Sequence, residues 1–228
     1  MPRSASVRPA KRRTRETAER ILDVAGRLTQ TKGFNGFSYA DVAERLGITK
    51  ASLHYHFPTK AKLGEALIAR YSARFAAAFA HVDRSVADAP GRLAAYAELY
   101  GRVLRAERMC LCGMLAAEQQ TLPEVMRQAV RRFFDDQEAW LVRVLDQGRV
   151  EGTVRFPGSA GSMARAILSG LEGAMLLARS YRDPERFRAA VEGLLAPLGV
   201  DPPERRSARP RARSRARLSA TLTTGSGV

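Results

Sequence analysis

Residues 47–57, GITKASLHYHF, contain a short helical pattern that is difficult to explain as part of a hydrophobic core. A glycine and a threonine suited to cap a helix stand at its start, and Pro58 ends it. Most of its side chains are polar or ring-bearing, and its inward anchors are Leu53 and Phe57, four residues apart. Such a helix is typical of one that lies in a groove of DNA.

A second short helix is predicted immediately before this stretch. Ser38 and Asp41 have the spacing of a capping box, which predicts a helix over Tyr39–Leu46. A longer helix, with apolar residues recurring at three- and four-residue spacing, is predicted from Thr14 to about Lys32. Two short helices joined by a glycine turn and preceded by a supporting helix form a helix-turn-helix unit.

The remainder of the chain also has the periodicity of helices. The helices expected there run from about residue 60 past Phe79, from after a break at Pro90-Gly91 to about Glu107, over about Leu111–Gln120, from Pro123 to about residue 150, over Met163–Arg179 and over Asp183–Leu198. We therefore expect an all-α protein of about nine helices, with a DNA-binding domain over residues 14–60 and a larger helical domain over residues 61–200.

The positive charge of the chain is concentrated at its two ends. The net charge is +15 and the sequence pI is about 10.9. Residues 1–15 hold six bases and no acid, and residues 201–228 hold seven arginines and two acids. We expect a disordered basic arm over residues 1–13 and a disordered basic tail over residues 201–228. The charge predicts a polyanionic partner, nucleic acid first and an acidic membrane surface second.

The cysteine content and the lack of long apolar runs indicate in which cellular compartment the protein is found. Cys110 and Cys112 are the only cysteines, so no disulfide framework follows and a reducing compartment fits. No apolar stretch follows the basic N-terminal residues, so we expect no signal peptide. No apolar run approaches the ~18 residues of a membrane span. We expect a cytoplasmic protein with no membrane partner.

The sequence gives little support to an enzyme. It lacks a Gly-x-Ser-x-Gly motif, a phosphate-binding loop and a zinc-type His-Glu pair. Asp135 and Asp136 adjoin on a helix and point about 100° apart, so they form no paired acid–base site. His54 and His56, two residues apart, lie about 200° apart on a helix and cannot share a metal ion. We expect no catalytic residues, no cofactor and no metal.

In a helix-turn-helix, the N-terminal residues of the second helix lie nearest the base edges of the major groove. The residues in that position are Thr49, Lys50, Ala51 and Ser52. Lys50 can donate to guanine O6 or N7, and Ala51 permits close approach. Residues further along are placed for phosphate contacts, namely His54, Tyr55, His56 and Lys60.

The stretch GFNGFSYADVAERLGITKASLHYHFPTKAKL, residues 33–63, closely resembles the DNA-binding domain of TetR-family transcriptional regulators. The resemblance covers about Arg20–Tyr71 and adds Ser38 and Tyr39 to the phosphate contacts. It also implies a double-stranded DNA operator, a fourth helix that relays the state of the protein, and a divergent helical domain for a small-molecule effector. Homodimerisation through the last two long helices is implied as well. Some members carry a base-reading arginine where Ala40 stands here, so the operator sequence does not carry over.

The cysteine pair has two interpretations. Cys110 precedes a short helix whose dipole would lower the pKa of its thiol, and Arg105 and Arg108 would add to that effect. The segment Cys110–Gly113 looks like the Cys-Leu-x-Gly segment in a branch of the family that includes regulators of reactive electrophiles. The alternative is that both cysteines pack as small hydrophobes among apolar neighbours. A metal site would require distant ligands.

The aromatic and methionine side chains of the second domain suggest an effector pocket. The candidates, with Cys110 as a possible sensor, are Met114, Phe133, Trp140 and Met175, although each is more readily explained as an ordinary core residue. The function we expect is a homodimeric repressor that a small-molecule effector, or an electrophile sensed at Cys110, releases from a near-palindromic operator. The alternative is a helical protein that binds DNA or membrane surfaces without sequence preference or effector control.

Overall fold

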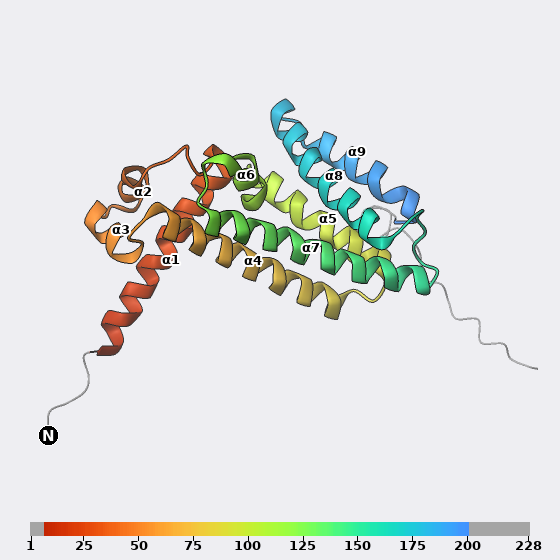
Figure 1. The fold of residues 1–228 in the computed structure, drawn as a ribbon, viewed down its shortest axis with the longest axis horizontal. Coiled ribbons are helices and arrows are strands. Elements are labelled where there is room, and N and C mark those ends of the chain that lie inside the picture. Colours follow the sequence, from red (N-terminus) through yellow and green to blue (C-terminus); the bar gives the residue numbers. More distant parts are fainter. Residues whose placement is uncertain (1–6, 201–228) are drawn as a thin grey trace, which may run out of the picture.

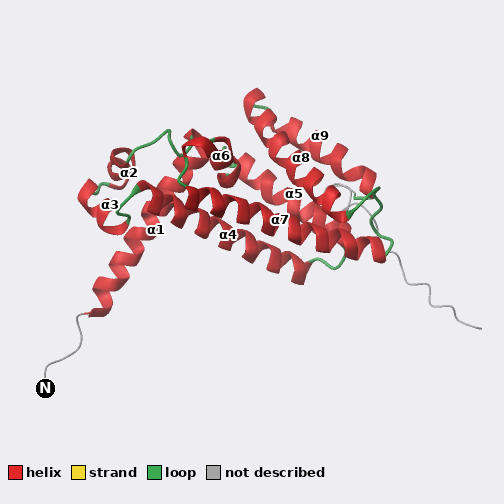
Figure 2. Ribbon diagram, viewed as in Figure 1, coloured by secondary structure: helices red, strands yellow, loops and turns green. Residues whose placement is uncertain are grey.

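A computed structural model describes residues 7–200, which are all-α, as predicted (Figures 1 and 2). The helices are α1 Val7–Lys32, α2 Tyr39–Leu46, α3 Lys50–His56, α4 Lys60–Ser85, α5 Ala89–Arg105, α6 Leu111–Ala117, α7 Glu124–Val150, α8 Ala160–Tyr181 and α9 Pro184–Leu195, with 3-10 turns at Gln119–Thr121 and Ala196–Leu198. The described part of the chain contains no strand.

The three N-terminal helices form a helix-turn-helix unit at one end of the molecule (Figure 1). Ser38 and Asp41 make the predicted capping box at the start of α2. Gly47 ends α2 with φ +63°, a left-handed conformation that glycine adopts at no steric cost. The backbone N–H groups of Gly47 and Ile48 donate to carbonyls of the last turn of α2, so this turn fixes where α3 begins.

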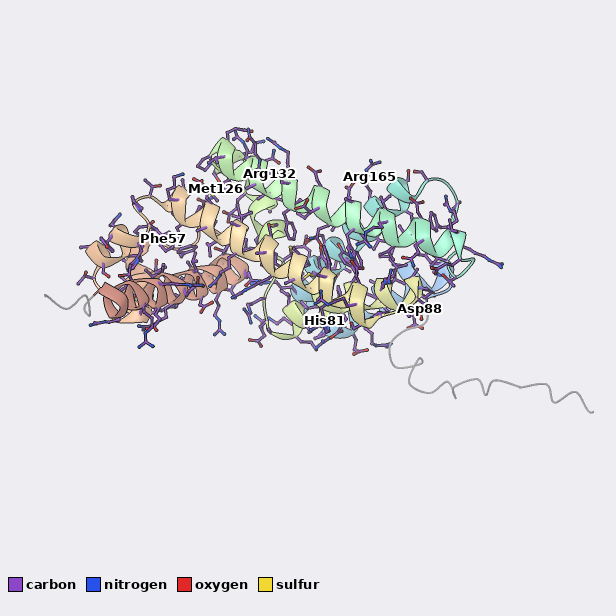
Figure 3. All side chains as sticks on the ribbon, turned by 90° about the horizontal axis from the view of Figure 1, so that it is seen from below. Phe57, His81, Asp88, Met126, Arg132 and Arg165 are labelled. Atoms are coloured by element: carbon purple, nitrogen blue, oxygen red, sulfur yellow. The ribbon has the colours of Figure 1, made fainter. Side chains whose placement is uncertain are left out.

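Long helices carry the fold away from the DNA-binding unit. α4 runs from near Phe57 to near Asp88, and α7 packs alongside it (Figure 3). α5 packs on α7, α8 and α9, and α8 packs on α7 and α9. One continuous hydrophobic core joins the helix-turn-helix unit to these helices. The stripe that the sequence predicts on α4, from Leu63 to Phe79, is buried in that core.

The helix boundaries differ from those predicted at a few places. α1 begins at Val7, seven residues before the predicted Thr14, so part of the arm predicted to be disordered is helical. The predicted disorder of residues 1–6 and 201–228 lies outside the described residues. Pro90 lies within the first turn of α5, where proline is tolerated. The helix predicted over Leu111–Gln120 divides into α6 and a 3-10 turn.

Within residues 7–200, no helix combines the length and the apolar character needed to cross a membrane.

Candidate nucleic-acid interface and its supporting contacts

The N-terminal turn of α3 is exposed and firmly supported from behind. Thr49 caps the helix, its hydroxyl accepting from the backbone N–H of Ser52 at 3.1 Å. Leu53 is fully buried and Phe57 is 9% exposed, so they anchor the inner face of the helix, as predicted. Thr49, Lys50 and Ala51 are exposed and Ser52 is half-buried. The four residues predicted to contact bases therefore share one accessible helix start.

Tyr39 and His54 brace α2 against the end of α3. The Tyr39 hydroxyl donates to the Phe57 carbonyl at 2.8 Å, and burial raises the pKa of Tyr39 to about 12. The His54 ring lies 4.7 Å from the Tyr39 ring, and its Nδ1 is 3.2 Å from the Pro58 carbonyl oxygen. The donor of Tyr39 is therefore engaged inside the unit. Nδ1 of His54 must carry a proton to face the Pro58 carbonyl, so Nε2 can donate to a phosphate only in the imidazolium form, in which both ring nitrogens are protonated.

Lys60 has a structural role that sequence reasoning missed. Its ammonium donates to the Phe37 carbonyl at 2.6 Å and lies over the rings of Phe34 and Phe37, 4.9 and 4.7 Å from their centroids. Burial lowers the pKa of Lys60. These contacts fix the turn before α2 to the start of α4. A phosphate contact from Lys60 stays a prediction, and the ammonium would have to share its donors.

Ser38 is similarly engaged. Its hydroxyl donates to Oδ2 of Asp41 at 2.7 Å, and this hydrogen bond, with a second from the Ser38 backbone, lowers the pKa of Asp41. The hydroxyl proton is therefore held by a carboxylate rather than free for a phosphate. Tyr55, by contrast, is 75% exposed, and its ring lies against that of half-buried His56. The exposed ring of Tyr55 fits the predicted contact with the DNA backbone.

The C-terminal end of α1 is tied to the helical domain by side chains from distant parts of the sequence. Arg179, in α8, donates to the carbonyls of Gln30 and Thr31 at 3.1 and 2.6 Å. The side-chain amide of Gln30 donates to the Met109 carbonyl at 2.9 Å, and the Met109 backbone N–H donates to the Gln30 carbonyl at 3.1 Å. A change in the segment before α6 or in α8 therefore acts directly on α1.

The cysteines are not the activated thiols that the sequence suggested. Cys110 is 1% exposed and Cys112 is fully buried. Burial raises the pKa of both thiols well above the ordinary value, and the carboxyl of Glu172 beside them adds to this effect. The hydrogen bond from the Gly113 backbone to the Cys110 sulfur opposes it without reversing it. The expectation of a lowered pKa at Cys110 is thus wrong, because tertiary burial outweighs the dipole of a short helix.

The aromatic residues predicted to line an effector pocket are packed in the core. Trp140 stacks on Phe79 at 4.6 Å, and its indole N–H donates to Asp83 at 3.3 Å. Phe133 and Met175 are at most 1% exposed, and Met114 packs half-buried against the core. These placements match the alternative that the sequence left open, in which each is an ordinary core residue.

Two surface clefts lie elsewhere in the described structure. One, of about 340 Å³, lies between α1, α4, α5 and the start of α6. The other, of about 290 Å³, lies between α5 and α9. Neither is lined by the residues predicted for the pocket.

α8 exposes an apolar surface that no other described helix covers. Leu176, Leu177 and Tyr181 are 61%, 58% and 61% exposed. Between Arg165 and Arg179 the helix carries one charged residue, Glu172, whose carboxyl faces the core beside Cys110. Exposed apolar side chains gathered on one helix indicate a protein–protein contact.

A helix-turn-helix unit with an exposed recognition helix, attached to a larger helical domain, is the architecture of a DNA-binding regulator. Residues 21–67 match the family described as "Bacterial regulatory proteins, tetR family", and residues 89–194 match "Tetracyclin repressor-like, C-terminal domain". A TetR-family regulator from Agrobacterium tumefaciens is 33% identical, with a TM-score of 0.79 over 81% of this chain and 98% of that one. A TetR regulator from Legionella pneumophila is also 33% identical, with a TM-score of 0.73 over 80% and 97% of the two chains.

The HTH-type transcriptional repressor NemR of Escherichia coli K12 is 25% identical over 195 residues, which cover 81% of this chain and 96% of NemR. The chain belongs to the TetR family of transcriptional regulators. It is a DNA-binding regulator and not an enzyme, in agreement with the sequence analysis.

Proposed function

We propose that the protein is a homodimeric repressor that binds a near-palindromic operator and leaves it when a small-molecule effector binds the helical domain. The exposed N-terminal turn of α3, held from behind by Leu53 and Phe57, carries this proposal. In it, Lys50 reads base edges and His54 and Tyr55 contact phosphates. The similar E. coli protein NemR is named a repressor, which supports the same sign of control here.

The dimer forms, in this proposal, through α8 and α9. The exposed Leu176, Leu177 and Tyr181 supply apolar area that a second copy would bury. A two-fold axis there presents two copies of α3 about 34–36 Å apart, the spacing of one turn of DNA. We assign residues 14–60 to DNA binding and residues 61–200 to effector binding and dimerisation. A DNA operator as partner places the protein in the cytoplasm.

The effector we propose is a reversible ligand rather than an electrophile that reacts at Cys110. A thiolate is the reactive form of cysteine, and burial keeps Cys110 protonated and shielded from reagents. A ligand controls the operator only through a difference in its affinity for the DNA-bound and free conformations. Arg179 and Met109 contact the end of α1, so a ligand in the helical domain can favour the DNA-bound or the free conformation through them.

The test is fluorescence anisotropy on DNA from upstream of the protein's own gene, with random DNA as the control. We expect saturable binding to the upstream DNA that survives competition by random DNA. Affinity that is equal for both DNAs and falls steeply with salt would instead indicate the non-specific binder. Sedimentation of wild type and Leu177→Glu tests the dimer, which we expect the glutamate to weaken.

The thiol is tested in the same assay. N-ethylmaleimide is added to wild type and to Cys110→Ser in parallel, and we expect both to remain on the DNA alike. Release of wild type alone would establish Cys110 as a sensor and overturn the reversible-ligand proposal.

A further inference from the structure

The cleft between α1, α4 and α5 is lined by more bases than acids. Among the residues that line it, the one acid is Asp23, and the bases are Arg27, Arg70, Arg74, Arg102 and Arg108. Charges of one sign gathered in a cleft with apolar walls focus the electrostatic potential there. The cleft therefore attracts anions.

Three of these arginines already have carboxylate partners. Arg70 lies 3.1 Å from Glu19 and 2.9 Å from Asp23, and Arg74 is 3.6 Å from the same aspartate. Arg102 pairs with a glutamate one turn earlier in α5, at 3.7 Å. Their charge is largely balanced, so they form the walls of the cleft rather than its binding groups.

The other two arginines have no ion-pair partner among the described residues. Arg27 is exposed at the α1 side of the cleft, and Arg108 is half-buried at the α5 side. The Nε of Arg108 is buried and makes no hydrogen bond within residues 7–200. Buried donors are nearly always paired, more so on a charged group, so this guanidinium lacks the partner within the protein that a buried arginine usually has.

The backbone just before Arg108 adopts an uncommon conformation. Glu107, just before it, has φ +57°, a left-handed conformation that side chains other than glycine rarely adopt. In the resulting turn, the Arg108 backbone N–H donates to the Val103 carbonyl at 3.1 Å. Glu107 is thus the left-handed residue that ends α5, and its backbone N–H donates to the Leu104 carbonyl, so this turn fixes the direction in which Arg108 leaves the helix.

The interior of the cleft is suited to an apolar body. The side chains that provide this surface are Leu67, Phe75, Leu99, Val103 and Leu111. We infer that this cleft binds a small organic acid, whose carboxylate Arg108 and Arg27 hold and whose apolar ring or chain lies on this surface. Carboxylate matches the forked donors of arginine, and the apolar contacts favour organic acids over inorganic anions.

A ligand in this position would touch the DNA-binding unit directly. The α1 residues Gly26, Arg27 and Gln30 line the cleft, and the Gln30 carbonyl is the group held by Arg179 and the Met109 backbone. An acid bound between Arg27 and Arg108 thus sets the position of α1 relative to α5. The claim that such an acid is the effector rests on the proposed function. The claim that the cleft binds an organic acid does not.

The test is isothermal titration of the full chain, without DNA, with 2-naphthoate and decanoate as probes and 2-naphthamide as the uncharged match. We expect saturable binding of a carboxylate and at least tenfold weaker binding of the amide, because a hydrogen bond to a charged group is worth about tenfold or more. Arg108→Gln should weaken carboxylate binding by about tenfold. Arg84→Gln, the same change at an exposed arginine outside the cleft, should leave it unchanged.

A second variant guards against an effect of Arg108→Gln on folding. Ala78→Trp fills the cleft from α4 and keeps every arginine, and we expect it to abolish binding with an unchanged helical circular dichroism spectrum. Absence of saturable binding of both acids, equal binding of acid and amide, or equal binding by wild type and both cleft variants would overturn the inference. If the acids bind but do not release the protein from its operator, the cleft remains an organic-acid site, and the result contradicts the proposed control by an effector.

Discussion

Arg179 of α8 donates a 3.1 Å hydrogen bond to the carbonyl of Gln30 in α1, across 149 residues of sequence. Its second guanidinium nitrogen donates to the next carbonyl, that of Thr31, at 2.6 Å. The last carbonyls of a helix have no partner within it and carry partial negative charge, so a cation there both caps and stabilises α1. One side chain thus joins the proposed dimerisation helix to the helix that supports the recognition helix.

Removing this side chain should loosen α1. We expect Arg179→Ala to lower the free energy of unfolding by about 1–3 kcal/mol, as measured by urea denaturation, because the Thr31 carbonyl loses its side-chain donor and the Gln30 carbonyl keeps only the Met109 N–H. Amide exchange should rise in the last turn of α1. The control is Arg165→Ala, also in α8, which removes an exposed ion pair with Glu138 of α7. It should change stability much less. Equal effects of the two would show that the cap is unimportant.

Lys60→Ala separates a structural from a DNA-binding role. Because the ammonium bonds to Phe37 and lies over two rings, we expect a loss of about 1–2 kcal/mol in the free energy of unfolding. Lys62→Ala, nearby on the exposed face of α4, is the control. Unchanged stability together with weaker binding to all DNA would mean that Lys60 acts on phosphates instead.

Glu172 should make stability depend on pH. Burial raises the pKa of this carboxyl from 4.5 to about 7. Between these values the unfolded chain loses the proton and the folded protein keeps it, so the free energy of unfolding falls as pH rises, by about 3 kcal/mol in all. We expect Glu172→Gln to be more stable than wild type at pH 8 and similar to it at pH 4, in thermal melts across that range.

The control for this experiment is Glu44→Gln, at an exposed position of α2. It should follow the wild-type pH dependence. If the stability of Glu172→Gln also shows the wild-type pH dependence, then Glu172 does not titrate with the raised pKa.

Lys50→Ala tests the assignment of base contacts. We expect affinity for the specific operator to fall about five- to a hundredfold, the value of one good contact to a base, with little change on random DNA. Anisotropy at fixed salt measures both. An equal loss on operator and random DNA would assign Lys50 to the phosphate backbone.

Local sequence patterns predicted the parts of the fold that local interactions determine. The capping box of Ser38 and Asp41, the turn at Gly47 and the cap at Thr49 each act within a few residues, and α2 and α3 begin and end as predicted. The buried stripe of α4 follows from helical spacing alone. The exposed start of α3 could be predicted for the same reason.

The contacts that sequence reasoning missed depend on residues far apart in the chain. Nothing local to Lys60 indicates that its ammonium reaches Phe37, and nothing local to Arg108 indicates a cleft closed by α1. The pKa of Cys110 was predicted in the wrong direction because the helix start is visible in the sequence, whereas the packing that desolvates the thiol is not. Periodicity likewise cannot distinguish an aromatic side chain in a core from one lining a pocket.

α4 is a single uninterrupted helix of 26 residues that runs from beside the recognition helix into the helical domain, ending near Asp88 (Figure 3). At 1.5 Å per residue it is about 39 Å long, so it works as a lever arm, and a tilt of about five degrees moves its tip by about 3 Å. That displacement is close to the ~3.4 Å step between neighbouring base pairs. In the proposed two-fold pair the tips of the two α4 helices would move in opposite senses, so a tilt of this size would take both recognition helices out of register with the DNA.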